Sequence, residues 1–301
     1  ASYNAQSTEV DADHIAEMAR NEMVGRFGDA AYTDGYSVTL TVDSQKQQEA
    51  TDALRAGLEA YDQRHGFRGP IGQISGDDLA PDNLPQLMAG YPRVASLIPA
   101  VITAIDDDAN IAEVYARTLG EAAIPFETMT WARRHKTENL TGPEPERPSD
   151  VLNVGDVVYV KTMGDQPLLA GETSKSPDQE ASQNARLKLA LSQVPKVQGA
   201  LISLKAESGA VEALSGGYSF SQTKYNRATQ ARRQPGSTFK PFLYLNALEK
   251  GRTPATIYND APIVFDDSEL ETTWRPQNSS GQFYGPTRLR EALYRSAGLA
   301  G

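Results

Sequence analysis

The stretch Gln234-Pro235-Gly236-Ser237-Thr238-Phe239-Lys240-Pro241 decides how the second half of this chain is interpreted. Its Pro-Gly pair marks a chain turn, and an apolar run with helical spacing continues from there to Lys250-Gly251, which is a typical helix stop. Residues three apart lie on the same side of a helix, so Lys240 is expected beside the Ser237 hydroxyl. The pattern predicts a helix whose first turn places a serine and a lysine together.

A serine and a lysine in this arrangement can carry out acyl transfer without a histidine. Serine is a weak nucleophile and needs an adjacent base to take its proton, and a lysine can be that base when burial or nearby positive charge lowers its pKa. Amides at the start of a helix favour developing negative charge, so the Ser237 amide is a candidate for half of an oxyanion hole. The same residues also fit a serine that caps a helix beside a surface lysine, so the flanking sequence must decide.

Other catalytic chemistries lack their parts in this sequence. The chain has three histidines, His14, His65 and His135, without an H-E-x-x-H pair, and no serine lies in G-x-S-x-G. It has no cysteine, which excludes disulfides and thiolate sites. One acidic run comprises Asp260, Asp266, Asp267, Glu269 and Glu271. This run could hold a metal or form a carboxylate pair, although a solvated loop is the favoured interpretation. We expect no cofactor and no metal.

Length and charge set broader limits. A chain of 301 residues is long enough for two domains. The formal net charge of −10, without a stripe of lysine and arginine interleaved with aromatics, argues against nucleic acid as a partner. The longest apolar run, residues 97–105, is far shorter than the ~18 residues of a membrane helix.

The first part of the chain predicts a helix, a strand and a second helix. Residues 11–26 carry apolar side chains at helical spacing, and residues 37–43 alternate between apolar and polar, as in a half-buried strand. Asp43-Ser44 is a candidate cap for a helix over residues 45–63. No catalytic pattern occurs in this part.

Short apolar segments separated by turns follow, which is typical of a small barrel or sheet. The expected strands are residues 97–105, 111–115, 124–129, 157–161 and 185–191. Trp131, followed by Arg133, Arg134, His135 and Lys136, is the one cluster of basic and aromatic residues. It is either a contact surface or an ordinary exposed loop.

A β-hairpin is predicted between the barrel and the Ser237 helix. Residues 197–204 and 210–214 have the composition of strands, and Glu207-Ser208-Gly209 supplies the turn. This order suits an α/β serine acyltransferase in which a sheet edge forms one wall of the cleft.

Several ordered blocks resemble the transpeptidase domain of class A penicillin-binding proteins, in particular the 1a type of Gram-negative bacteria. They are Tyr225-Asn226-Arg227-Ala228, residues 233–241 around Ser237, Asn259-Asp260-Ala261-Pro262-Ile263, Trp274-Arg275-Pro276-Gln277-Asn278, and residues 285–293. This resemblance covers residues 190–296 densely. Residues 12–68, which end in Tyr61-Asp62-Gln63-Arg64-His65-Gly66-Phe67-Arg68 and are followed by Gly69-Pro70, also resemble the segment that precedes an inserted accessory domain in that family.

The resemblance implies a multi-domain protein of α/β and β class. It would contain a penicillin-binding transpeptidase domain with the serine β-lactamase-like α/β fold, incomplete here, and an inserted OB-like β-barrel. We expect a linker segment over residues 1–68, the OB-like accessory domain over residues 69–188, and the N-terminal part of the transpeptidase domain over residues 189–301.

The resemblance also implies the reaction and its partners. Ser237 would be the nucleophile, Lys240 its general base and Ser296 a proton relay in a DD-transpeptidase that cross-links peptidoglycan stem peptides and is acylated by β-lactam antibiotics. An outer-membrane lipoprotein activator would dock on the OB-like domain. The chain lacks an initiator methionine and a signal peptide, which suggests an excised fragment. Its parent would carry a glycosyltransferase domain and a single-pass anchor, on the periplasmic side of the bacterial inner membrane.

Two departures from the family leave the activity of this chain open. The S-x-N motif reads Ser296-Ala297-Gly298, and no K-T-G occurs in the 301 residues. Truncation or missing internal segments are favoured over a natural inactive relative. The alternatives are a β-lactam-hydrolysing relative, because S-T-F-K also occurs in class D β-lactamases, and a non-enzymatic fragment that binds a partner through the OB-like domain.

Overall fold

The computed structural model describes residues 9–163, 187–262, 277–278 and 280–297. The chain forms two compact units, residues 1–231 and residues 232–301, and each is described by itself. The predicted boundaries at residues 68 and 188 remain predictions. Among the described residues, no helix combines the length and the apolar character that crossing a membrane requires.

Three helices open the first unit, α1 (Asp13–Phe27), α2 (Ala30–Thr33) and α3 (Ser44–Gln63). The predicted helices over residues 11–26 and 45–63 are confirmed, and the Asp43 side chain caps α3 by accepting a 2.9 Å hydrogen bond from the Lys46 amide. The strand predicted over residues 37–43 is wrong. This segment meets the strand β10 (Val211–Ser215) through only two hydrogen bonds among the described residues, from Asp43 N to Glu212 O and from Thr41 Oγ1 to Val211 O, so it has no ladder partner.

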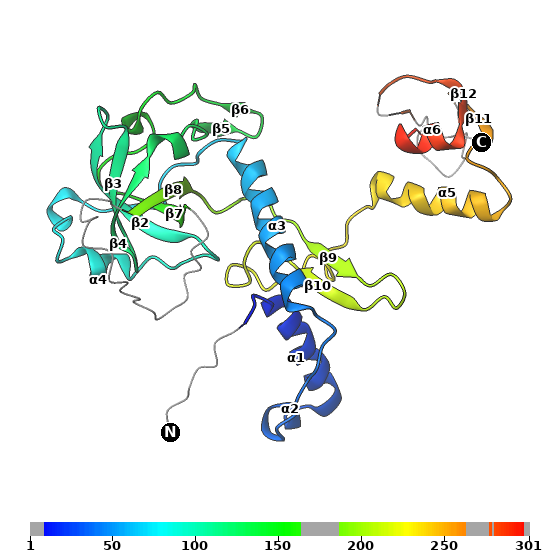
Figure 1. Cartoon of the computed structure of the whole chain (residues 1–301), viewed down its shortest axis with the longest axis horizontal. Coiled ribbons are helices and arrows are strands. Elements are labelled where there is room, and N and C mark those ends of the chain that lie inside the picture. Colours follow the sequence, from blue (N-terminus) through cyan, green and yellow to red (C-terminus); the bar gives the residue numbers. More distant parts are fainter. Residues whose placement is uncertain (1–8, 164–186, 263–276, 279, 298–301) are drawn as a thin grey trace, which may run out of the picture. The chain divides into compact units, whose positions relative to one another are not determined.

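Mainly antiparallel strands then build a closed barrel. The sheet order is β1 (Gly72–Gln73), β7 (Asp156–Thr162), β2 (Ile98–Asp106), β3 (Ile111–Ala116), β4 (Gly120–Pro125) and β8 (Leu187–Ser192). β8 pairs with β4 in parallel and with β7 in antiparallel orientation, which closes five strands into a barrel (Figure 1). The predicted OB-like domain is confirmed.

The barrel encloses the main hydrophobic core. Alternate residues of β3, namely Ala112, Val114 and Ala116, point inward, as the period of a strand requires. The strand predicted over residues 124–129 is wrong beyond Pro125, where a 3₁₀ turn, Phe126–Thr128, begins. Shorter elements complete this region: η1 (Gly76–Asp78), α4 (Leu84–Met88), β5 (His135–Thr137), β6 (Leu140–Thr141) and η3 (Pro148–Asp150).

α3 connects the barrel to the hairpin of β9 (Leu201–Leu204) and β10 (Val211–Ser215), as Figure 1 shows. The buried Gln47 side chain donates to the Leu214 carbonyl and accepts from its amide, at 3.0 and 2.8 Å. Near the other end of α3, the buried Glu59 carboxylate accepts from Tyr218 Oη at 2.7 Å and from Lys161 Nζ, on β7, at 2.9 Å. The hairpin is confirmed, although its first strand begins at Leu201 rather than at residue 197.

The second unit begins with a 3₁₀ turn, η5 (Gly236–Phe239), that continues into α5 (Lys240–Glu249). Two short antiparallel strands, β11 (Ile257–Asp260) and β12 (Gly285–Arg288), follow, and β12 leads directly into α6 (Leu289–Tyr294). The helix predicted after Ser237 is therefore confirmed as a 3₁₀ turn and an α-helix. It ends before Gly251, which has a φ of 81°.

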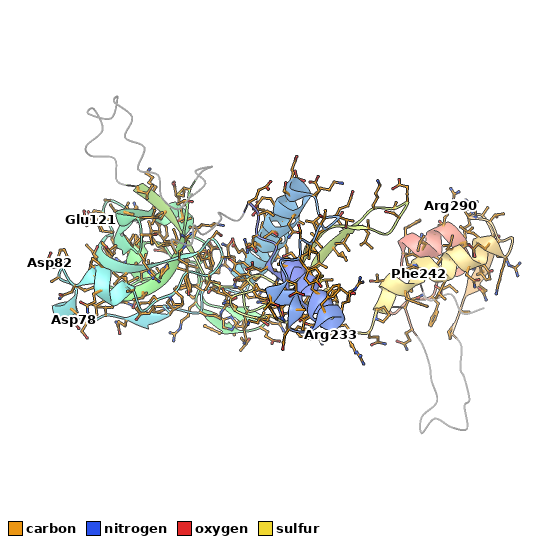
Figure 2. All side chains as sticks on the ribbon, turned by 90° about the horizontal axis from the view of Figure 1, so that it is seen from below. Asp78, Asp82, Glu121, Arg233, Phe242 and Arg290 are labelled. Carbon is orange, nitrogen blue, oxygen red and sulfur yellow. The ribbon has the colours of Figure 1, made fainter. Side chains whose placement is uncertain are left out.

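α5 is apolar but buries none of its residues in the described part of the chain. Phe242, Leu243 and Leu245 are 64, 53 and 54% exposed, and Figure 2 shows the Phe242 side chain on the surface of the helix. A helix this apolar normally packs against other elements. Its exposed face therefore suits a further packing partner.

Candidate active site

Ser237 lies in the η5 turn, one residue after Gly236, whose φ of 56° suits glycine. Its carbonyl accepts a hydrogen bond from the Lys240 amide, which closes the turn and starts α5. Residues three apart eclipse one another in a 3₁₀ turn, so Ser237 and Lys240 lie on the same side of it. The Ser237 side chain is exposed and makes no hydrogen bond within the described residues.

Lys240 and Ser296 meet although 56 residues separate them in sequence. The Lys240 ammonium donates to Ser296 Oγ at 3.0 Å and also to the Ser296 carbonyl. Lys240 is half-buried, and no carboxylate pairs with it among the described residues. The lysine thus connects the turn that carries Ser237 to the end of α6.

The end of α6 holds Ser296 in an unusual backbone conformation. Ser296 has a φ of 52°, its amide donates to the Leu293 carbonyl at 3.0 Å, and the Ala297 amide donates to the Ala292 carbonyl at 2.9 Å. These two bonds and the left-handed residue form a Schellman motif, in which glycine is usual. Ala292 and Ala297, which occupy the positions of the usual apolar pair of that motif, are both buried. A side chain with a hydroxyl is thus kept where glycine would fit more easily.

A second polar cluster, which the sequence did not single out as a unit, supports β11. Asp260 is 1% exposed, and its Oδ2 accepts from Asn278 Nδ2 at 2.8 Å and from the Tyr284 amide at 3.0 Å. Burial, with the Asp260 charge as the smaller cause, raises the pKa of Tyr244, a residue of α5. Asp260 therefore belongs to a buried network rather than to the solvated loop expected for it. The blocks that contain Asp260 and Asn278 supplied the available sequence signal.

The remaining predicted candidates divide in two. Trp131 packs edge-on against Phe67 at the barrel core, and Arg133 pairs with Glu144, so both have structural contacts. The acidic residues after Asp260, namely Asp266, Asp267, Glu269 and Glu271, lie outside the described residues, as does Gly298. In the described part of the chain, no group of His, Asp and Glu has the geometry to hold a metal ion.

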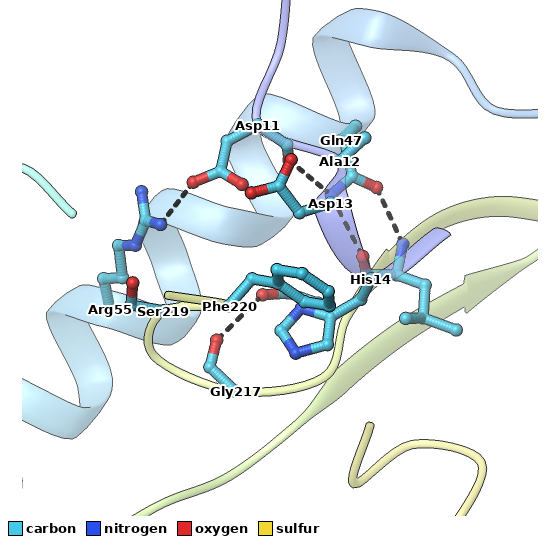
Figure 3. A pocket seen from close by; sticks show the side chains of 11 residues that line it. Asp11, Ala12, Asp13, His14, Gln47, Arg55, Gly217, Ser219 and Phe220 are labelled. Carbon is cyan, nitrogen blue, oxygen red and sulfur yellow. Dashed lines mark hydrogen bonds and ion pairs between the residues drawn. The ribbon is translucent and has the colours of Figure 1, made fainter. Parts of the chain in front are cut away.

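The first unit contains a small buried cavity around His14, away from the Ser237 turn in sequence. Figure 3 shows the imidazole beside Phe220 and next to the backbone of Gly217. The cavity measures about 10 Å³, enough for one water molecule. Burial lowers the pKa of His14, and the nearby charge of Asp11 opposes this shift. The predicted wall formed by the hairpin stays a prediction, because the hairpin and Ser237 belong to different units.

The arrangement in the second unit presents three groups of the kinds that acyl transfer uses. It presents an accessible hydroxyl at Ser237, a half-buried amine at Lys240 and a second hydroxyl at Ser296. A hydroxyl attacks a carbonyl effectively only when a base takes its proton, and a lysine that is hydrogen-bonded to a second hydroxyl can pass that proton onward. Lys240 now donates to two oxygens, so it must lose a proton before it can act as a base.

Comparisons with known proteins identify both regions. The family "Penicillin-binding protein OB-like domain" matches residues 67–197, and the family "Penicillin binding protein transpeptidase domain" matches residues 199–299. Penicillin-binding protein 1A of Pseudomonas aeruginosa is 42% identical to this chain, and the match covers 99% of this chain and 33% of that protein. Penicillin-binding protein 1A of Escherichia coli is 36% identical, and the match covers 98% of this chain and 32% of that protein. The crystal structure of penicillin-binding protein 1A from Haemophilus influenzae superimposes with a TM-score of 0.74 at 32% identity, over 96% of this chain and 38% of that one.

Proposed function

We propose an acyl-transfer mechanism from the premise that this chain belongs to the class A penicillin-binding proteins, a family of peptidoglycan transpeptidases. The chain spans about a third of the length of the curated relatives it matches, with coverages of 33 and 32%. The activity proposed here is therefore that of a longer protein with the same residues. In it, Ser237 is acylated by a stem peptide that ends in D-alanyl-D-alanine.

The acylation step can be followed through the bond that forms, the bond that breaks and the path of the proton. Ser237 Oγ attacks the carbonyl carbon of the penultimate D-alanine, and its proton passes to the neutral amine of Lys240. The proton then moves through Ser296 Oγ to the nitrogen of the terminal D-alanine, which leaves as the peptide bond breaks. The amine of a second stem peptide attacks the ester and releases Ser237. A β-lactam would acylate Ser237 in the same way, although its leaving nitrogen stays attached through the opened ring.

The observation that carries this proposal is the contact between Lys240 and Ser296. Lys240 Nζ lies 3.0 Å from Ser296 Oγ, so the two groups that must exchange the proton are within hydrogen-bond distance. The left-handed backbone of Ser296 supports the proposal further, because strain of this kind concentrates at functional sites. An ordinary surface lysine beside a helix cap would need neither feature.

Location and partners of the longer protein are proposed with the reaction. Peptidoglycan lies outside the inner membrane, so the transpeptidase would work on the periplasmic side, held by an anchor and accompanied by a glycosyltransferase domain. The OB-like barrel, which no step of the acyl transfer uses, would receive a lipoprotein activator. Barrels of this type commonly serve as binding modules.

Benzylpenicillin and intact mass spectrometry test the proposal. We expect a stable adduct on a protein extended to the length of the relatives, and its loss in Ser237→Ala. The control Ser221→Ala changes a serine of the first unit and should leave the adduct intact. Rapid turnover without a stable adduct would instead indicate a β-lactamase. An adduct that survives in Ser237→Ala would overturn the assignment of the nucleophile.

A further inference from the structure

A cleft in the first unit, lined by several charged and polar residues, contains none of the residues proposed for the acyl transfer. It has a volume of about 390 Å³, which is in the range of sites for small molecules. Three segments line it: the end of α3 with His65, the β5–β6 hairpin with His135, Glu138 and Asn139, and the chain after β8 with Lys196. These segments are distant in sequence, so the fold itself assembles the cleft.

The two histidines of the cleft are held in one tautomer. His65 Nδ1 lies 2.8 Å from the Tyr61 carbonyl oxygen, and His135 Nδ1 lies 2.7 Å from the His65 carbonyl oxygen. A carbonyl oxygen can only accept, so each Nδ1 carries a proton and donates it. Each Nε2 is therefore the ring nitrogen available to a ligand, as an acceptor in the neutral ring and as a donor in the protonated ring.

The charge of the one buried carboxylate beside the cleft is already compensated. Asp62 is 3% exposed and accepts from both terminal nitrogens of Arg68, at 2.9 and 2.7 Å. It also accepts from Gln193 Nε2 at 2.8 Å and from the Lys196 amide at 3.0 Å. This last bond fixes the backbone of Lys196 at the edge of the cleft.

Two of the charged residues that line the cleft are left without an opposite charge among the described residues. In the described part of the chain, neither the Lys196 ammonium nor the Glu138 carboxylate forms an ion pair. Both line the cleft together with the His65 and His135 rings. A cation next to two imidazoles is a chemical match for an oxyanion. Glu138 and Asn139 are suited to hydroxyl or amine groups on the same molecule.

We propose that this cleft binds a polar ligand through an oxyanion, a carboxylate or a phosphate, held by Lys196 Nζ and by the Nε2 atoms of His65 and His135. Glu138 and Asn139 contact the N–H or O–H groups of that ligand. The chain as a whole has a formal net charge of −10, so a general attraction for anions does not explain such binding. The proposal is independent of Ser237, which lies in the other unit.

The chain offers a built-in control for a binding experiment, because it has three histidines and only two line this cleft. Nitrogen-15 NMR of the imidazole side chains at about pH 6, where ordinary histidines are substantially protonated, reports each ring separately. The probes are inorganic phosphate and a soluble muropeptide with free carboxylates. We expect saturable shifts at His65 and His135 with one or both probes, while His14, buried elsewhere, stays unchanged.

Two variants separate the cleft from the rest of the surface. Lys196→Gln should weaken binding about tenfold, because it removes a charge-assisted hydrogen bond from an exposed side chain. Lys188→Gln changes an exposed lysine on β8 and should leave the affinity unaltered. Tighter binding of phosphate identifies a phosphate ligand, and tighter binding of the muropeptide a carboxylate ligand. The proposal is overturned if neither probe gives a saturable shift, if His14 shifts in parallel, or if Lys196→Gln binds like the unaltered chain.

Discussion

Because the backbone of Ser296 is left-handed, glycine and alanine at this position should differ in their effect on stability. Both substitutions remove the hydroxyl that accepts from Lys240 at 3.0 Å, so their difference isolates the backbone. A residue with a Cβ pays about 1–2 kcal/mol in the left-handed region. Glycine avoids this cost but loses about 0.5–1 kcal/mol through its greater freedom in the unfolded chain. With a φ of 52° at Ser296, we expect Ser296→Gly to be more stable than Ser296→Ala by about 0.5–1 kcal/mol.

Hydrogen exchange followed by mass spectrometry measures this difference locally. The amides of Ser296 and Ala297 close the Schellman motif, so the peptide that contains α6 reports its opening. After correction for intrinsic exchange rates, this peptide should exchange about two- to fivefold more slowly in the glycine variant than in the alanine variant. The reasoning is refuted if the alanine variant is equally or better protected.

The same pair of variants tests the role of the hydroxyl. In the longer, active protein, acylation by benzylpenicillin should be slow in both, since neither can relay a proton from Lys240. If glycine restores the rate that alanine loses, the backbone and not the hydroxyl is what matters at Ser296.

Three further predictions concern other parts of the chain. Asp260→Ala removes the oxygen that accepts from Asn278 Nδ2 and Tyr284 N, so it should destabilise the second unit by about 2–3 kcal/mol in urea unfolding. The control Asn259→Ala, at the exposed neighbouring residue, should lower the free energy of unfolding by less than about 0.5 kcal/mol. Burial, reinforced by Glu59, raises the pKa of Tyr218, so the folded state keeps its proton when the unfolded state loses it. Stability should therefore fall above about pH 10, with Tyr218 contributing up to about 1.4 kcal/mol per pH unit. Tyr218→Phe should remove this contribution and make the slope shallower in urea titrations, while Tyr61→Phe, at an exposed site, should leave the slope unaltered. Phe242 is 64% exposed, so Phe242→Glu places a charge on an apolar surface and should lower the binding of a hydrophobic dye to this chain. The circular dichroism of the helix should not change. The control Arg252→Glu, at an exposed polar site, should leave dye binding unaltered.

Local signals explain which elements could be predicted from the sequence. α3 has a capping aspartate and helical spacing, and β3 is a short, mainly apolar segment, so short windows of sequence contain the information that predicts them. Residues 37–43 show the limit of this approach. Val38 and Leu40 alternate with polar residues as in a strand, but a strand also needs a neighbour, and the edge of β10 supplies only two bonds.

The site contains contacts that no local pattern encodes. The spacing of Ser237 and Lys240 predicts that they lie on the same side of a turn, whereas the approach of Ser296 depends on how β12 and α6 return the chain across 56 residues. The family resemblance supplied Ser296 as a candidate. The buried contacts of Asp260 with Asn278 and Tyr284 were missed, because an acidic residue in a polar run is usually solvated.

The exposure of α5 could not be predicted either. Its apolar sequence favours a helix, but spacing alone does not tell which element will cover it. In the described residues its apolar side chains remain exposed. The positions of Ser237 and Lys240 are therefore defined independently of the element that covers α5.

The central claim, that Ser237 is the nucleophile, is tested most directly by locating the β-lactam adduct. Trypsin cuts after Arg233 and not before Pro241, so one peptide, residues 234–250, contains Ser237, Thr238 and Lys240. Fragmentation of this peptide, after brief exposure of the longer protein to benzylpenicillin, distinguishes the three side chains. An adduct on Ser237 is the predicted result, and an adduct on Thr238, on Lys240 or on a different peptide would contradict it.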